Sequence, residues 1–313
     1  MIEISGLTKQ FGNFTAVDNL SFAVKQGEVL GFLGPNGAGK STTMKMITGF
    51  LLPSAGKVSV YGQDMSSNPM EAKRRIGYLP EGAPAYGEMT VLEFLVFIAK
   101  VRGVPKALVQ ERVDYVVNKI NLQKVVHKTV DTLSKGYGRR VGLAQAVIHD
   151  PDVLILDEPT DGLDPNQKYE VRKLISEMAA EKIIIISTHI LEEVEAVCTR
   201  AVIIADGKLL ADGTPQELAA QSRYHHAVTL TVVGVVDAAE QLGCLDGVDS
   251  VEQGASGRLT VVPANGADVF TAVRDFADQN QWNVAELYLE QGRLDQVFRK
   301  LTIGSELNKL EAA

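Results

Sequence analysis

Residues 34–41 carry the most specific chemical pattern in this sequence, because they fit G-x-x-x-x-G-K-[ST]. Glycines in such a loop let backbone N–H groups turn inward onto phosphate oxygens, and the helix that follows adds partial positive charge. Lys40 is expected to reach the β- and γ-phosphates, and the Ser41 hydroxyl to coordinate Mg²⁺. The pattern therefore predicts a nucleotide-phosphate site made of Gly34, Pro35, Asn36, Gly37, Ala38, Gly39, Lys40, Ser41 and Thr42.

Two carboxylates follow an apolar run further along the chain. Val153–Leu156 is expected to form a buried strand, and Asp157 and Glu158 come directly after it. Asp157 is expected to hold Mg²⁺, directly or through water, and Glu158 to polarise the water that attacks the γ-phosphate. An isolated Asp-Glu pair at a strand end more often caps a following helix or carries solvated surface charge. Its combination with the phosphate loop favours the catalytic interpretation.

Leu133-Ser134-Lys135-Gly136-Tyr137 precedes a predicted helix that runs through Arg139-Arg140. Ser134 can cap that helix, and a helix N-terminus is a second place where an anion can bind. Spacing alone predicts no more than a helix start at this point.

The elements that must position these residues alternate between short apolar strands and helices. A hairpin is expected up to Val24 with its turn at Gly12-Asn13, and Val29–Leu33 reads as a strand buried on both faces. A helix is expected over 41–50, a mostly helical insert over about 90–146, and a further helix over 166–180. Further strands are expected at 57–61, 76–79, 153–156, 183–187 and 201–205. This order predicts an α/β fold with a largely parallel sheet.

The pattern changes near residue 221. Beyond it, strands and helices follow in the order βαββαβ with one more helix, which is the ferredoxin-like order. The sequence therefore predicts a first domain over 1–221, an accessory α+β domain over 222–302 and a tail over 303–313.

Composition limits the function classes. The 313 residues carry a formal net charge of −8, which weighs against a protein that binds nucleic acid through a basic face. The N-terminus lacks the features of a signal peptide, and no window has the apolar length of a membrane helix. The protein is expected to be cytoplasmic, and a separate chain would supply any membrane-spanning part. The two cysteines, Cys198 and Cys244, are too far apart in sequence to suggest a metal cluster.

Over about residues 1–220 the chain resembles the nucleotide-binding subunits of ABC transporters. The motifs stand in the family's order: the phosphate loop at 34–41, a signature-like LSKGY at 133–137, the acidic strand end at 153–158, EPTDGLDP at 158–165, and His189 after IIIIST. The resemblance implies a P-loop ABC ATPase cassette with a mixed sheet core and a helical insert. Phe11 matches the position that stacks on adenine, and Phe14 is the competing candidate.

The resemblance also implies an assembly. Two chains would form a head-to-tail dimer, a homodimer in the simplest case, with each ATP held by the phosphate loop of one chain and by Ser134 and Gly136 of the other. Asp164 would lie in the D-loop, and His189 would contact the γ-phosphate and orient the attacking water. Closest in character are ABC-2-type exporters, and LSKGYGRRVGLAQA resembles their gliding-motility-associated branch. The expected partner is an ABC-2-type permease at the inner face of the cell membrane, contacted near residues 81–89 and the insert.

Three residues depart from the family pattern. Lys135 and Tyr137 stand where Gly and Gln are usual, and Glu81 stands where the Q-loop glutamine would be. Glu81 can act as a Mg²⁺ ligand, but its charge repels the γ-phosphate unless the metal screens it. The alternative function is a nucleic-acid or ribosome ATPase of the same class. No nucleic-acid partner is expected, because the chain is acidic, has one phosphate loop and lacks sustained heptads between that loop and the signature.

Overall fold

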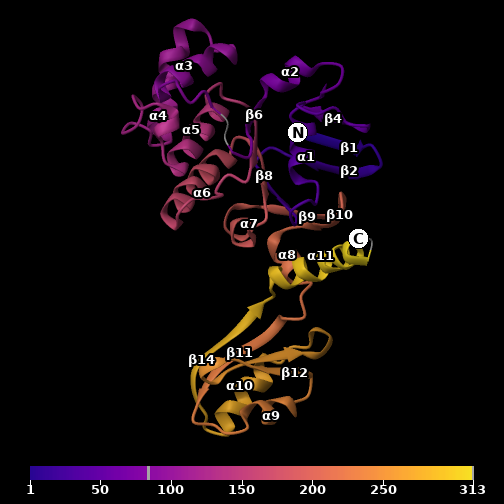
Figure 1. Ribbon diagram of the computed structural model, residues 1–313. Helices are drawn as coiled ribbons and strands as arrows, with labels where there is room; N and C mark the ends of the chain where they lie inside the picture. Colours follow the sequence, from indigo (N-terminus) through magenta and orange to yellow (C-terminus); the bar gives the residue numbers. More distant parts are fainter. Residues whose placement is uncertain (83–84, 312–313) are drawn as a thin grey trace. The chain divides into compact units, whose positions relative to one another are not determined.

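The computed structural model describes residues 1–82 and 85–311, and the chain forms two compact units, Met1–Asp212 and Gly213–Ala313. Figure 1 labels most of the helices and strands of both units.

A four-stranded antiparallel sheet begins the first unit. Its strands are β1 (Ile2–Phe11), β2 (Phe14–Val24), β4 (Ala55–Val60) and β5 (Gln63–Asp64), in the order β2-β1-β4-β5. Phe11 pairs with Phe14 across the two-residue turn, so the predicted hairpin is confirmed.

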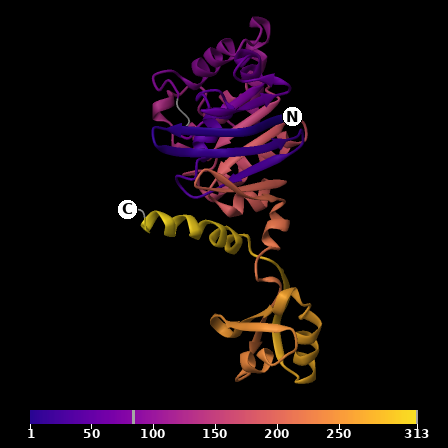
Figure 2. The same ribbon diagram turned by 90° about the vertical axis from the view of Figure 1, so that its right-hand side faces the viewer.

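A second, six-stranded sheet carries the strands that end in the chemical motifs. It contains β3 (Val29–Leu33), β6 (Ile76–Leu79), β7 (Val153–Asp157), β8 (Ile183–Thr188), β9 (Arg200–Ala205) and β10 (Lys208–Gly213), in the order β10-β9-β3-β8-β7-β6. The pairs from β9 to β6 are parallel. The largely parallel sheet predicted from the strand and helix order is confirmed. The strands are divided between two sheets, and the antiparallel one lies across the parallel one (Figure 2).

Seven helices of the first unit are described: α1 (Lys40–Ile47), α2 (Pro69–Arg74), α3 (Val91–Val101), α4 (Val109–Lys119), α5 (Lys135–Val147), α6 (Pro165–Ala179) and α7 (Leu191–Val197). The expected helical insert corresponds to α3–α5, which group together with α6 in Figure 1. Thr90 starts α3 with a capping box, because its side chain accepts from Glu93 N and the Glu93 carboxylate accepts from Thr90 N. Over the described residues, no helix has both the length and the apolar character that a membrane crossing requires.

The parallel strands bury both of their faces. Successive strand residues point to opposite sides, so Val153 and Ile155 pack in the core with α1 and the antiparallel sheet, while Leu154 and Leu156 pack in the core with the helical insert. The parallel strands, and the residues that follow their ends, are thereby held between two hydrophobic cores, one on each face of the sheet.

The second unit contains a separate antiparallel sheet. Its elements are α8 (Pro215–Ala219), β11 (His225–Val233), α9 (Ala238–Gly243), β12 (Val248–Gln253), β13 (Arg258–Pro263), α10 (Phe270–Gln279), β14 (Asn283–Gln291) and α11 (Leu294–Glu311). The strand order is β12-β13-β11-β14, and every pair is antiparallel. The core of this unit contains Val228, Leu230 and Val261 of the sheet together with Leu242 of α9 and Val273 of α10.

Two boundaries differ from those expected from the sequence. The stretch 303–313 is expected to be a tail, whereas α11 continues through Glu311, because Leu, Glu and Lys in this stretch favour a helix despite Gly304. The first domain is expected to end at 221, whereas the compact units divide between Asp212 and Gly213. The reason is that α8 packs against α11 and so belongs to the second unit.

His149, just after α5, gives the first unit an acid-sensitive point. Burial, followed by the nearby Arg102 charge, lowers the His149 pKa to about 4, and Nε2 lies 3.2 Å from the Ile76 carbonyl oxygen. An unfolded chain takes up a proton near the ordinary histidine pKa of about 6.5, so stability is lost as pH falls from there towards the folded-state pKa.

We expect the wild-type chain to lose about 2 kcal/mol more of its unfolding free energy between pH 7 and pH 5 than His149→Gln does. The glutamine amide keeps a donor near the Ile76 carbonyl but does not titrate. Urea unfolding of both proteins at the two pH values measures this difference. Equal acid losses in the two proteins would show that His149 is not the sensitive group.

Candidate functional site

The glycine-rich loop lies at the end of a central strand of the parallel sheet. β3 is fully buried between β8 and β9, and the loop leads from it into α1. Gly37 and Gly39 have φ of 80° and 101°, and a Cβ on Gly39 would lie 2.5 Å from the Ala16 carbonyl oxygen. Both positions therefore need glycine. The result is a set of backbone N–H groups at the N-terminus of α1, suited to bind an anion.

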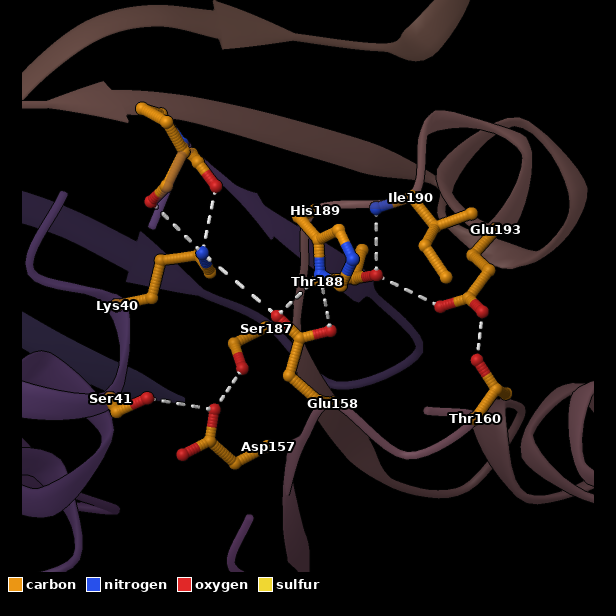
Figure 3. Close-up of polar contacts among 12 residues, drawn as sticks. Lys40, Ser41, Asp157, Glu158, Thr160, Ser187, Thr188, His189, Ile190 and Glu193 are labelled. Atoms are coloured by element: carbon orange, nitrogen blue, oxygen red, sulfur yellow. Dashed lines mark hydrogen bonds and ion pairs between the residues drawn. The ribbon is translucent and has the colours of Figure 1, made fainter. Parts of the chain in front are cut away.

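Lys40 lies across this loop with its ammonium buried. Nζ donates to the carbonyl oxygens of Gly34, at 2.7 Å, and Pro35, at 3.1 Å, and lies 3.9 Å from Glu158 Oε1 (Figure 3). Burial lowers the Lys40 pKa, whereas the charges of Glu158, Asp157 and Glu81 oppose that shift. The arrangement presents one cation to any anion that enters the loop.

Asp157 ends β7 beside Ser41 and is buried. Its Oδ1 accepts a hydrogen bond from Ser187 and lies 3.4 Å from Ser41 Oγ (Figure 3). Its Oδ2 is buried and has no hydrogen-bond partner among the described residues. A buried carboxylate oxygen without a partner is costly, so this atom is a candidate ligand for a cation.

Glu158 and His189 lie together although 31 residues separate them in the sequence. β7 and β8 are neighbours, and Glu158 and His189 directly follow their last residues. His189 Nδ1 lies 3.0 Å from Glu158 Oε2, and the Glu158 side chain is 12% exposed while that of His189 is 46% exposed. The structure thus places a carboxylate and an imidazole beside the loop, with the imidazole open to solvent.

A buried network that the sequence analysis did not identify supports the His189 segment. Glu193 on α7 accepts hydrogen bonds from Thr188 Oγ1, at 2.9 Å, and from the Thr160 hydroxyl, while Ile190 N donates to Thr188 Oγ1 (Figure 3). Burial raises the Glu193 pKa, and the Thr188 hydrogen bond opposes that shift. Ser187 was also missed. Ser187, Thr188 and Ile190 lie within two residues of His189 in the sequence, which was the available signal. Only the contacts identify the roles of these residues and of Thr160 and Glu193.

A cavity of about 310 Å³ brings eight of the predicted site residues together. Its lining is Phe14, Ala16, Asn36, Gly37, Gly39, Lys40, Ser41, Thr42, Glu81 and Glu158. Glu81 reaches the cavity from the segment after β6. Phe14 lines the cavity, whereas Phe11 does not and instead lies 5.2 Å from Lys9 Nζ. This geometry favours Phe14 over Phe11 as the aromatic at the site.

The signature-like segment lies outside that cavity. Ser134 caps α5 by accepting from Tyr137 N, and Asp164 caps α6 by accepting from Gln167 N. Gly136 packs so closely on the Gln167 side chain that a Cβ there would clash with it. The described lining residues include none of Ser134, Gly136 and Asp164. The predicted site residues are thus divided between two places on the chain.

A protein-family model described as ABC transporter matches residues 17–161. The chain is 40% identical to the probable multidrug ABC transporter ATP-binding protein YbhF of Escherichia coli over 71% of its own length, but this match covers only 38% of YbhF. It is 41% identical to the bacitracin transport ATP-binding protein BcrA of Bacillus licheniformis, over 68% of this chain and 69% of BcrA.

One relative matches along nearly the whole chain. The linearmycin resistance ATP-binding protein LnrL of Bacillus subtilis is 31% identical, over 96% of this chain and 98% of LnrL. Among solved structures, an ATP-binding subunit of an ABC transporter superposes with a TM-score of 0.66 and 31% identity, over 71% of this chain and 92% of that one.

Proposed function

The chain belongs to the family of ABC transporter ATP-binding proteins, and on that basis we propose that it binds and hydrolyses Mg-ATP to drive a separate transmembrane partner. The observation that carries the proposal is the cavity at which Lys40, Ser41 and Glu158 meet beside Asp157. The Lys40 ammonium and the backbone N–H groups of the loop are suited to bind the phosphates. Asp157 is suited to bind a metal ion, and Glu158 to polarise a water molecule.

The residues in and beside the cavity fit a magnesium ion. Ser41 Oγ and the Asp157 carboxylate lie side by side, Asp157 Oδ2 has no partner in the described part of the chain, and Glu81 lines the same cavity. Hard oxygen ligands of this kind are what Mg²⁺ prefers. Bound Mg²⁺ would neutralise charge on the phosphate oxygens.

Glu158 is the proposed general base for hydrolysis. Its carboxylate takes a proton from the attacking water, whose oxygen then bonds to the γ-phosphorus as the bond to the bridging oxygen of ADP breaks. His189, within 3.0 Å of that carboxylate, orients the water and contacts the γ-phosphate. Lys40 holds the β- and γ-phosphates in line.

Dimerisation would complete the site. Ser134 and Gly136 lie at the N-terminus of α5 and outside their own chain's cavity, which supports a role for them, together with Asp164 of the D-loop, at the ATP of a second subunit. We infer a head-to-tail homodimer with two ATP molecules between the subunits.

Export is the proposed direction of transport, with an ABC-2-type permease as partner. BcrA is named for bacitracin transport and LnrL for linearmycin resistance, and both names suit proteins that remove a toxic compound. The segment 133–146 supports the gliding-motility-associated branch. The protein would act at the cytoplasmic face of the membrane. The alternative role on nucleic acid or ribosomes gains no support from these relatives.

A second cavity of about 350 Å³ is the proposed docking groove for the permease. It is lined by Thr48, Phe50, Met70, Lys73, Arg74, Ile76, Tyr78, Val101, Arg102 and Gly103. Phe50 is 75% exposed and packs on Tyr78, and the lining includes the cations Lys73, Arg74 and Arg102, of which Arg74 pairs with Glu71. An amphipathic partner helix with acidic flanks fits this combination. The contact face expected from the sequence, residues 81–89 and the helical insert, overlaps this groove only at residues 101–103. Of that expected face, residues 83–84 lie outside the described part of the chain.

The second unit is the proposed ferredoxin-like accessory domain. Its strand order, β12-β13-β11-β14, with all pairs antiparallel and the helices α9 and α10 between strands, supports that assignment. The match to LnrL covers 96% of this chain and therefore extends over this unit.

Calorimetric titration with Mg-ATP tests the function. Lys40→Ala is expected to weaken ATP binding roughly 10- to 100-fold, because it removes the charge that faces the phosphates. Phe14→Ala is expected to weaken it roughly 5- to 100-fold through loss of base stacking, whereas the matched Phe11→Ala should leave it unchanged. A wild-type chain that binds no ATP, or a Lys40→Ala variant with unchanged affinity, would overturn the proposed function. A reversed order of the two Phe variants would overturn only the choice of Phe14.

A further inference from the structure

Arg139 is a buried cation that the catalytic scheme above does not use. It lies on α5, five residues after the capping Ser134, and is only 7% exposed. Burying a guanidinium is costly unless hydrogen bonds and nearby negative charge compensate it. Arg139 therefore needs partners, and those partners indicate what the residue does.

The partners are three backbone carbonyl groups at the ends of two neighbouring strands. Nη1 donates to the Pro80 carbonyl oxygen at 3.1 Å, and Nη2 donates to the Asp157 carbonyl oxygen at 2.7 Å and to that of Glu158. Pro80 directly follows β6, and Glu158 directly follows β7. A single side chain thus joins α5 to the segment that carries Glu81 and to both acidic residues of the site.

The Glu158 backbone needs such support. Its φ is +50°, in the left-handed region that non-glycine residues seldom occupy. Its N–H donates to the Ser187 carbonyl oxygen at 3.0 Å, and its own carbonyl accepts from Arg139. Contacts from β8 on one side and α5 on the other thus hold the peptide groups flanking this residue. The direction of its carboxylate, towards Lys40 and His189, depends on that backbone conformation.

We propose that Arg139 is a positioning residue that fixes the backbone of Glu158 and the Pro80 segment in the geometry needed for hydrolysis. This inference rests on the proposed function. Arg139 is not among the residues that line the cavity, and its hydrogen bonds go to carbonyl and not to carboxylate oxygens, so it acts through the backbone and not on ATP. Ser134 begins the helix that carries Arg139. Arg139 therefore also connects the segment proposed to meet the second subunit's ATP with Glu158, the proposed general base of its own chain's site.

Steady-state hydrolysis by Arg139→Gln, Arg139→Lys and Arg140→Gln tests the proposal, together with ATP titration and thermal melting. Arg139→Gln is expected to lower kcat roughly 100-fold, the size of effect that a displacement of about 1 Å causes, while ATP affinity stays within about 3-fold. Arg139→Lys is expected to restore about tenfold of that loss, because an ammonium can still donate to two carbonyls. The matched Arg140→Gln removes an arginine that lies over the Tyr137 ring and should leave kcat unchanged.

A kcat for Arg139→Gln within about 3-fold of wild type would overturn the inference. So would a loss of kcat and ATP affinity together that the lysine variant does not rescue, since that is the result of a merely structural role. Should the glutamine variant fail to fold, the lysine variant decides: kcat reduced with ATP affinity retained supports positioning, and unchanged kcat overturns it. A wild-type chain that neither binds nor hydrolyses ATP would instead mean that the proposed function is wrong.

Discussion

Glu158→Gln is expected to abolish hydrolysis while ATP still binds. The amide keeps the shape of the carboxylate but cannot accept the proton of the attacking water, so the rate should fall roughly 100- to 10,000-fold. The Glu158 side chain is largely buried beside Lys40 and His189. Among the described residues that line the cavity, the other carboxylate is Glu81, which lies on a different segment.

The variant should also accumulate as an ATP-bound dimer, because the step that separates the subunits no longer occurs. Size-exclusion chromatography with and without Mg-ATP measures this, and phosphate release measures the rate. Lys40→Ala is the control, since it should lose the ATP-dependent dimer as well as hydrolysis. A Glu158→Gln protein that hydrolyses ATP at the wild-type rate would show that Glu158 is not the base.

Mixing two inactive variants, Lys40→Ala and Ser134→Arg, is expected to restore part of the hydrolysis. If Ser134 completes the site of the facing subunit, a mixed dimer has one site with both lesions and one with neither. In an equal mixture with random exchange, about a quarter of all sites are then intact. The position of Ser134 outside its own chain's cavity is the structural reason to expect this.

The mixture is compared with each variant alone at the same total concentration, after incubation long enough for subunits to exchange. Exchange is verified with two differently labelled wild-type samples. If Ser134 served the nucleotide of its own chain, every site would keep a lesion and mixing would restore nothing. That result, with exchange demonstrated, would contradict the proposed dimer geometry.

Local chemistry made much of the site predictable. The phosphate loop is a continuous segment whose glycines, lysine and serine are read directly from the sequence. The structure places residues 34–39 between β3 and α1, and Lys40 and Ser41 begin α1, as the pattern requires. Asp157 could be assigned because an apolar strand ends there. The meeting of Glu158 with His189 was also expected, but through the family resemblance, since neither spacing nor composition shows that β7 and β8 are neighbours.

Other features depended on contacts between distant segments. Phe11 and Phe14 have the same chemistry and lie on either side of one turn. Only the position of the hairpin relative to the phosphate loop decides which of the two rings lines the cavity. Arg139 reads as an ordinary helix residue until α5 is packed against the ends of β6 and β7. The Glu193 network likewise needs Thr160 and Thr188, from different segments, to meet.

The sequence by itself determined the phosphate loop, the acidic strand end and most of the strands and helices, because each depends on neighbouring residues or on short-range periodicity. The short elements β5, α2, α7, β10 and α8 were not predicted. Tertiary structure decided which strands share a sheet, which aromatic faces the cavity, and which buried groups hold Glu158 and His189 in place. These depend on pairings between residues far apart in the chain. A hydrogen bond from Arg139 to a backbone carbonyl leaves no mark in the sequence at the accepting residue, because every residue has that carbonyl.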